Sequence, residues 1–399
     1  MMRIPIWPAA GLLAGIVSCS TASDAPTRSA TRDSAGTQII ENHDAGWNGT
    51  PAWTVDPRPA LVIGTVDGPE QYQFSGIRGA FRLTDGTFAV ADGSRNIRFY
   101  DSSGRFTHQY GREGAGPGEF RVISLIRRFA GDSLLVWDQA LRRVTIIPAD
   151  GADGRIVEAT TLPGFFFASD VFDDGSLLGI SSEGVDLGTA QPGLLTTSAA
   201  YLRYDPSTAA LDTIATLDGI QASFLNDHGT VVSVPFSAEP VAATAEMEVH
   251  TGAGRQYEIR VHSASGDLLR IVRLDRPNPP LDQTTTRQFV ERLVERQRTS
   301  AARERIARSF DGLPFPATLP AYERLLVDSG GNLWAAAYAV ADSLPVSWTV
   351  FAPDGRLLGD LTTPAGFTPY QIGSDWLLGV SEDSLGVERV ALLRLNKPN

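Results

Sequence analysis

One unit of short apolar strands and glycine-containing turns recurs along the chain from about residue 60 onward. Its clearest copy covers residues 77–110, where Asp85-Gly86 and Ser103-Gly104 separate alternating apolar runs. Such dipeptides between apolar runs predict β-hairpins, because the turn needs positive φ angles at its central positions. The unit therefore predicts a small antiparallel sheet of four strands that is repeated along the chain.

Further copies of this unit follow the first at 134–151, 165–217, 229–272 and 325–358, and an incomplete copy with three strands lies at 370–395. We expect residues 60–63 to supply the missing fourth strand. The segments 63–77 and 110–123 share their order of glycine, proline and apolar residues, which places both between an outer strand and the next unit. Six units of ~40–50 residues predict an all-β fold, a six-bladed β-propeller closed by its N-terminal strand. Five or seven blades stay open as alternatives, because the third and fourth copies are irregular.

The segment 111–120, Gly-Arg-Glu-Gly-Ala-Gly-Pro-Gly-Glu-Phe, resembles the blade linker of NHL-type six-bladed β-propellers, especially those of bacterial envelope lipoproteins. The likeness is close over residues 60–150, looser to about 275, and recovers after 320. It implies a fold and no particular chemistry, because propellers of this type include partner-binding, nucleic-acid-binding and enzymatic members. We expect Arg112 and Glu113, which flank the glycines, to line one rim of the ring and to contact a partner.

The N-terminal residues predict export and lipid anchoring. Residues 1–18 combine Arg3 with an apolar run too short for a membrane span, which is typical of a signal peptide. The run ends in Ile-Val-Ser-Cys and resembles a bacterial lipobox, which implies lipidation of Cys19, the only cysteine in the chain. An ordinary signal peptide that contains a cysteine is the alternative. Ser20 favours the outer membrane, and residues 19–52, which are polar, are expected to form a flexible tether before a propeller at 53–399.

Charge and cysteine content exclude several classes of protein. The chain carries 34 Lys and Arg residues against 46 Asp and Glu residues, a net charge of −12, and Lys397 is its only lysine. Because nucleic-acid backbones are bound through clustered basic residues, we expect no nucleic-acid partner. One cysteine excludes a disulfide scaffold and any cysteine-rich metal site.

Two segments interrupt the repeat. Residues 235–255 are polar and are expected to form a long loop over one rim. Residues 283–310 predict a helix capped by Thr285 or Thr286, with seven arginines and three glutamates on its polar face and a local charge of +4. A basic helix can touch an anionic partner or a lipid surface, or it can lie on the propeller as a solvated excursion. Among its residues we expect partner contacts from Arg292, Arg296 and Arg303.

No catalytic motif, metal site or cofactor site is predicted. The five histidines, at positions 43, 108, 228, 250 and 262, show no metal-ligand spacing, and the Gly-x-Ser-x-Gly nucleophile motif is absent. The sequence therefore favours an envelope-anchored binding or scaffolding propeller that presents one face of its ring to a protein, peptide or glycan. A hydrolase or lyase with its active site in the central channel stays open as the alternative, because the channel mouth is the usual pocket of such a fold.

Overall fold

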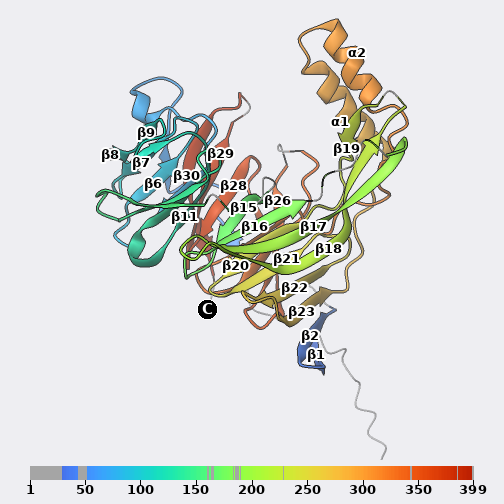
Figure 1. Cartoon of the computed structure of the whole chain (residues 1–399), viewed down its shortest axis with the longest axis horizontal. Helices are drawn as coiled ribbons and strands as arrows, with labels where there is room; N and C mark the ends of the chain where they lie inside the picture. Colours follow the sequence, from blue (N-terminus) through green and yellow to red (C-terminus); the bar gives the residue numbers. More distant parts are fainter. Residues whose placement is uncertain are drawn as a thin grey trace, which may run out of the picture.

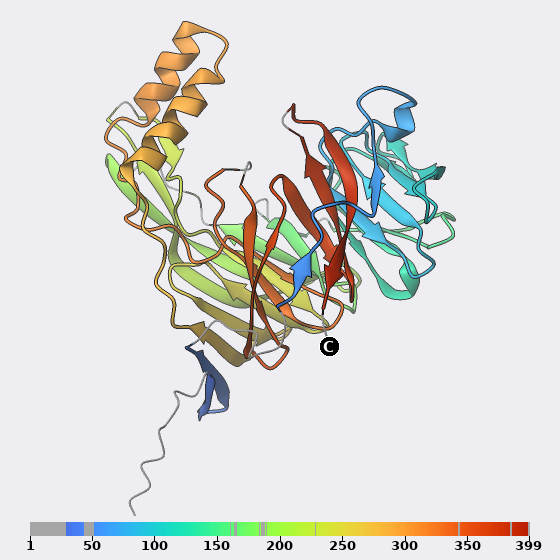
Figure 2. The same cartoon turned by 180° about the vertical axis from the view of Figure 1, so that it is seen from behind.

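The computed structural model describes residues 29–43, 52–159, 161–162, 166–182, 184, 188, 190–227, 229–341, 344–383 and 385–397. Within them, six sheets each contain a run of four antiparallel strands. We call these sheets blades 1 to 6, in chain order. Figures 1 and 2 show them from the two opposite sides.

Blade 1 contains β5 (Gly79–Arg82), β6 (Phe88–Ala91), β7 (Ile97–Tyr100) and β8 (Phe106–Tyr110). Blade 2 contains β11 (Ile123–Arg128), β12 (Leu134–Asp138), β13 (Arg143–Ile147) and β14 (Arg155–Glu158). Blade 3 contains β15 (Phe166–Val171), β16 (Leu177–Ser182), β17 (Gly193–Asp205) and β18 (Ala210–Leu225). Blade 4 contains β20 (Val241–Ala245), β21 (Glu248–Gly252), β22 (Glu258–Ser263) and β23 (Leu268–Leu274). Blade 5 contains β24 (Arg324–Val327), β25 (Leu333–Ala336), β26 (Val346–Phe351) and β27 (Leu357–Thr363). Blade 6 contains β28 (Phe367–Ile372), β29 (Trp376–Glu382), β30 (Glu388–Asn396) and β4 (Leu61–Ile63). Shorter strands are β3 (Thr54–Val55), β9 (Arg112–Glu113), β10 (Glu119–Phe120) and β19 (Val231–Ser233), and short 3-10 turns cover Glu70–Tyr72 and Ala130–Asp132.

The blades pack against one another in a ring, each with its first strand innermost. β5 contacts β11, β11 contacts β15, β15 contacts β20, β20 contacts β24, and β28 lies against β5. The Ser329 N–H donates a 3.0 Å hydrogen bond to the Ile372 carbonyl, which links blade 5 to blade 6. A cluster of buried apolar side chains fills each space between neighbouring blades. The predicted all-β propeller is therefore confirmed.

The ring has two different rims. We call lower the rim with the turns between first and second and between third and fourth strands, and upper the rim with the linkers between blades. The predicted glycine hairpins lie on the lower rim: Gly86 and Gly104 have φ of +88° and +80° and close turns onto Leu83 and Asp101 with hydrogen bonds of 3.0 and 2.8 Å. The upper rim is therefore free to carry the long insertions.

The predicted closure by an N-terminal strand is confirmed. β4 pairs antiparallel with β30, with Ile63 opposite Val390 and Leu61 opposite Leu392. Ile63 is 2% exposed and belongs to the apolar cluster between blades 6 and 1, whereas the neighbouring Val62 is 47% exposed. The last blade is thus completed by residues from the other end of the domain, which leaves no blade free to peel away.

The similarity between the two linker segments has a structural cause. At the end of β6, Asp92 accepts a 3.3 Å hydrogen bond from a linker amide, and Arg98 donates one of 2.8 Å to a linker carbonyl. In blade 2, Asp138 and Arg143 hold the next linker in the same way, at 2.6 and 3.0 Å. An acidic residue ending the second strand and an arginine on the third therefore fasten the incoming linker in both blades.

The prediction that residues 235–255 form a long loop is wrong. These residues include β20 and β21, the two inner strands of blade 4, while β19, expected to begin this copy, instead pairs with β18 of blade 3. Their alanine- and threonine-rich sequence hides the strand pattern. In addition, the turn between them places Glu246, with φ of 55°, where other blades use glycine.

The prediction of a flexible tether is also wrong for part of residues 19–52. Residues 29–42 form a hairpin of β1 (Ser29–Ser34) and β2 (Thr37–Asn42), and β2 pairs in parallel with β23 at the outer edge of blade 4. Ile39 and Ile40 are buried there. Asn42 donates 3.0 and 3.1 Å hydrogen bonds to the carbonyls of Arg273 and Gly355 and accepts one from the Leu357 N–H at 2.9 Å. The hairpin therefore joins blade 4 to blade 5.

The expected helix consists of two helices, α1 (Gln283–Glu295) and α2 (Ser300–Ser309), which form a hairpin. Asp282, rather than Thr285 or Thr286, caps α1 by accepting the Thr285 N–H. Thr299 accepts the Ala302 N–H and so begins the second helix, as capping threonines do. We call this hairpin the arm; it rises from the upper rim in Figures 1 and 2.

Candidate functional site

Two pockets open toward the two opposite rims of the ring. The upper pocket has a volume of 660 Å³ and lies where the upper ends of blades 5 and 6 meet. The lower pocket has a volume of 540 Å³ and is lined by the lower ends of the inner strands β11, β15, β20, β24 and β28. Tyr370 lines both pockets, so it marks the level at which they approach each other.

Tyr370 owes its position to a break in the β28 ladder. The pairing with β29 shifts between Pro369 and Gln371, so Tyr370 forms a bulge, a device that re-aims a side chain. Its hydroxyl donates a 3.0 Å hydrogen bond to the Ile77 carbonyl in the linker to blade 1. Burial raises the pKa of Tyr370, against the opposing effect of the nearby Arg324 charge. The phenol is therefore neutral and serves as a fixed wall of both pockets.

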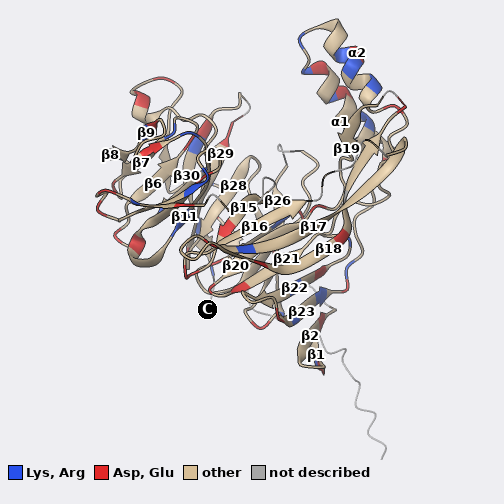
Figure 3. Cartoon of the chain, viewed as in Figure 1, with Lys and Arg blue, Asp and Glu red and all other residues tan. Residues whose placement is uncertain are grey.

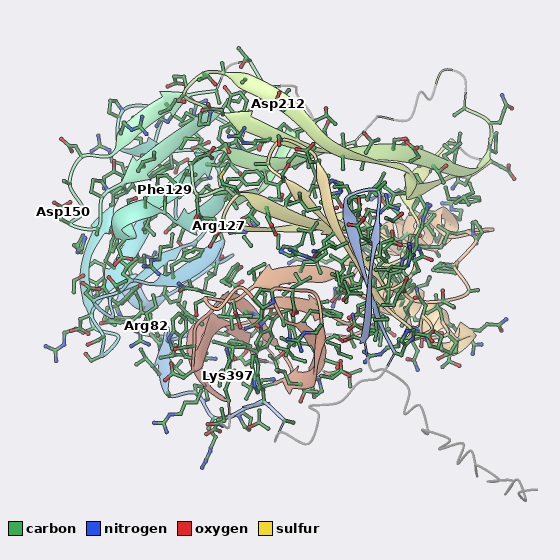
Figure 4. All side chains as sticks on the ribbon, turned by 90° about the horizontal axis from the view of Figure 1, so that it is seen from below. Arg82, Arg127, Phe129, Asp150, Asp212 and Lys397 are labelled. Carbon is green, nitrogen blue, oxygen red and sulfur yellow. The ribbon has the colours of Figure 1, made fainter. Side chains whose placement is uncertain are left out.

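The lower pocket contains an ion pair whose two charged side chains both have partners within the protein. Arg127 on β11 contacts Asp170 on β15 at 2.7 Å, and Asp170 also accepts the Thr244 N–H of β20 at 3.0 Å. Three successive inner strands are thus tied by one carboxylate. Figure 4, seen from below, shows Arg127 toward the interior of the molecule and Asp150 at its edge. Because both charges are satisfied within the protein, this network stabilises the ring rather than offering a free binding group.

The upper pocket differs in its acidic lining. Its rim and walls carry Glu323, Glu382, Asp383 and Glu388, and Arg324 lies at the start of β24. Burial lowers the pKa of Arg324, and its guanidinium makes no hydrogen bond or ion pair with any residue that the structure describes. Asp383, in contrast, contacts Arg389 at 2.9 Å, and this hydrogen bond lowers the pKa of Asp383.

Arg112 and Glu113 lie in β9, on the linker between blades 1 and 2. Arg112 contacts Glu119 at 2.8 Å, and Glu113 contacts Arg95 at 3.3 Å. Both side chains are exposed on the upper rim. Figure 1 shows β9 and the arm on opposite sides of the molecule, so the two sequence-predicted groups do not form one site.

Arg292, Arg296 and Arg303 lie on the arm and are exposed, as are its other four arginines. Figure 3 shows the concentration of basic residues on α2. The arm is fixed at its base, where Phe289 packs against Phe236 with ring centroids 5.0 Å apart. Neither helix contains a buried residue. The arm is thus held by one end and reaches away from the ring.

The histidines are spread over separate elements. His43 lies 3.8 Å from Asp275, His108 stacks on Phe99 on the outside of blade 1, and His228 falls outside the described residues. His250 and His262 lie on neighbouring strands of blade 4, and burial lowers the pKa of both, that of His250 to about 4. Among the described residues, no group of three or more His, Cys, Asp or Glu side chains could hold a metal ion.

The ring of radial four-stranded sheets makes this chain a β-propeller. A member of the DUF4221 family from Bacteroides vulgatus has a similar structure, with a TM-score of 0.53 at 10% identity, covering 87% of this chain and 99% of that one. A candidate exported protein from Bacteroides fragilis gives 0.47 at 11% identity (90% and 100% covered), and a gluconolactonase from Xanthomonas campestris gives 0.41 at 16% (86% and 100% covered). At such identities the likeness shows the fold alone.

No protein-family model matches the sequence, and no curated protein matches it. In the described part of the chain, no helix is both long and apolar enough to cross a membrane.

Proposed function

We propose that this chain is a binding propeller that presents its upper face to a protein or peptide partner. The observation that carries the proposal is the arm, which stands above the upper rim with seven exposed arginines. A helix that packs on a core buries some of its side chains, whereas neither α1 nor α2 contains a buried residue. The arm therefore contributes little to the core, and it carries a net charge of +4 in a chain whose net charge is −12. Such a segment is suited to contact an acidic partner.

We further propose that the propeller is attached to the outer membrane through a lipid on Cys19, as in the NHL-type envelope lipoproteins that it resembles. Cys19 lies outside the described residues. Because β1 begins at Ser29, about ten residues separate the lipid from the β1–β2 hairpin, and a chain of that length spans at most about 35 Å. Figures 1 and 2 show β1 and β2 at the opposite end of the molecule from the arm. Anchoring at this end would leave the arm directed away from the membrane.

The second candidate function is a hydrolase or lyase with its site in the channel. The observation that favours it is the gathering of Glu323, Glu382 and Glu388 in the upper pocket. Catalysis by two carboxyl groups requires one of them to hold its proton near neutral pH. Asp383, the fourth acidic residue of the pocket, has a lowered pKa and does not supply that acid. We place the binding function first because the exposed charge of the arm supports it directly.

A single capture experiment in native membranes tests both parts of the proposal. After mild crosslinking, the wild-type chain should remain with the membrane and bring down one stoichiometric partner. Cys19→Ala should move the protein to the soluble fraction. Replacing Arg292, Arg296 and Arg303 with Gln should lower recovery of the partner at least tenfold, because the charges of the arm attract it.

The matched control replaces three exposed arginines outside the arm, Arg58, Arg105 and Arg155, with Gln. It changes the net charge equally and should leave capture unchanged. Equal loss in both triple variants would show a general charge effect and contradict a role for the arm. Unchanged membrane partitioning of Cys19→Ala would contradict lipid anchoring.

A further inference from the structure

We infer that the upper pocket binds a short peptide with a free C-terminal carboxylate and a cationic group at its other end. The inference rests on the proposed function in one respect, namely that the upper face is the binding face. Three observations support it: an unpaired arginine within the pocket, two facing carboxylates at its rim, and an apolar wall between them.

Arg324 would bind the carboxylate. Its side chain is half-buried, and its guanidinium has no hydrogen-bonding or ion-pairing partner among the described residues. Burial is the main cause that lowers the pKa of Arg324; the charges of Tyr370 and Glu323 oppose it, and that of Arg127 lowers the pKa further. A guanidinium presents paired N–H donors whose geometry matches a carboxylate. An incoming carboxylate would therefore satisfy a cation that the folded chain leaves unpaired.

Glu382 and Glu388 would bind the cationic group. They are direct cross-strand partners in the β29–β30 pair, and both line the upper pocket. Like charges directly opposite each other destabilise a sheet. Glu388 uses one oxygen to accept the Ile77 N–H at 3.0 Å, while Glu382 is exposed at the rim. A cation placed between the two carboxylates would remove their repulsion.

The space between these charged groups suits a peptide. Trp348 and Phe367 are buried side chains of the pocket wall, and Val346 and Pro369 continue it. A volume of 660 Å³ lies in the middle of the range for small-ligand pockets and exceeds what one amino acid fills. A sugar chain would leave both the arginine and the two glutamates without partners of opposite charge.

The probe is the tripeptide Ala-Leu-Lys, titrated into the full-length chain in detergent by calorimetry. We expect binding of the free acid, and binding at least tenfold weaker for the C-terminal amide, because the amide removes the charge that Arg324 recognises. Acetyl-Ala-Leu-Lys, which keeps the carboxylate and the lysine side chain but lacks the cationic amino group at the other end, should also bind at least tenfold more weakly. Free lysine tests whether a single amino acid suffices, and we expect it to bind more weakly than the tripeptide.

Two variants assign these effects to residues. In Arg324→Gln the acid and the amide should bind equally weakly. Glu382→Gln should weaken binding of Ala-Leu-Lys while raising the melting temperature by about 1 °C, because it removes a like-charge pair from the free protein. Arg105→Gln, on the lower rim, is the matched control and should leave the binding constant unchanged.

Equal binding of acid and amide by the wild-type chain, or no binding of any of these peptides, would overturn the inference. So would an Arg324→Gln variant that keeps its preference for the acid. Loss of the membrane partner in the arm variant would still support the proposed function in those cases. Conversely, peptide binding without any captured partner would sustain the inference and contradict the proposed function.

Discussion

Replacing Ile63 with Asp is expected to destabilise the whole ring by about 5 kcal/mol. The change removes a fully buried aliphatic side chain, which contributes ~1.5–3 kcal/mol, and places an unpaired charge between blades 6 and 1, which costs several kcal/mol more. Because β4 is the strand that completes blade 6, its loss also opens the ring. Equilibrium unfolding in urea, followed by tryptophan fluorescence, measures the effect.

Val62→Asp is the matched control for this prediction. Val62 is the preceding residue of the same strand, is 47% exposed and points away from the cluster. We expect it to change the unfolding free energy by less than ~1 kcal/mol. If the two variants were equally stable, β4 would not close the ring.

Replacing Asn42 with Ala should cost about 3 kcal/mol, although the residue lies in a segment of polar composition. Its side chain is 1% exposed and satisfies the carbonyls of Arg273 and Gly355 and the amide of Leu357. Removing it leaves buried polar groups without partners, each at a cost of ~1–3 kcal/mol. Urea unfolding measures the loss, and limited proteolysis should show faster cleavage within residues 29–42.

Glu41→Ala serves as the comparison for Asn42. Glu41 is the adjacent residue and forms partly exposed ion pairs with Arg32 and Arg273, at 3.6 and 3.1 Å. Exposed pairs contribute ~0–1 kcal/mol, so a small effect is expected. An Asn42 variant as stable as the Glu41 variant would mean that residues 29–42 behave as the tether first expected from the sequence.

Much of the propeller could be predicted because its turns carry their own signal. Asp85-Gly86 and Ser103-Gly104 encode hairpins locally, and the shared linker spacing placed residues 60–63 in the last blade. The inner strands of blade 4 were missed because Val241–Ala245 is mostly alanine and its turn uses Glu246 instead of glycine. The structure of these two strands depends on the burial of their side chains between neighbouring blades, which no local sequence pattern indicates.

The hairpin at residues 29–42 was missed for a different reason. A strand added at a sheet edge is held mainly by backbone hydrogen bonds, which any sequence can make. Only Ile39, Ile40 and Asn42 are buried there, too few to show a period. In the arm, Thr299 could have signalled a second helix, because a threonine followed by Ser-Ala-Ala is a reasonable helix start.

The upper pocket could be predicted only in part. Glu382 and Glu388 flank a short turn, so a hairpin register would have placed them opposite each other. Their meeting with Arg324 could not be foreseen, because it depends on how blade 5 packs against blade 6. All five expected contact residues lie on the upper rim, as this pocket does, but β9, which contains Arg112 and Glu113, lies on the opposite side of the molecule from the arm.

Position-specific photocrosslinking in native membranes tests most directly whether the upper face is the binding face. A benzoylphenylalanine replaces Arg303 on the arm in one protein and Asp150, exposed in a lower-rim turn, in another. We expect one discrete crosslinked protein from position 303 and none from position 150. Crosslinks from position 150 alone, or the same products from both positions, would contradict a binding function of the upper face.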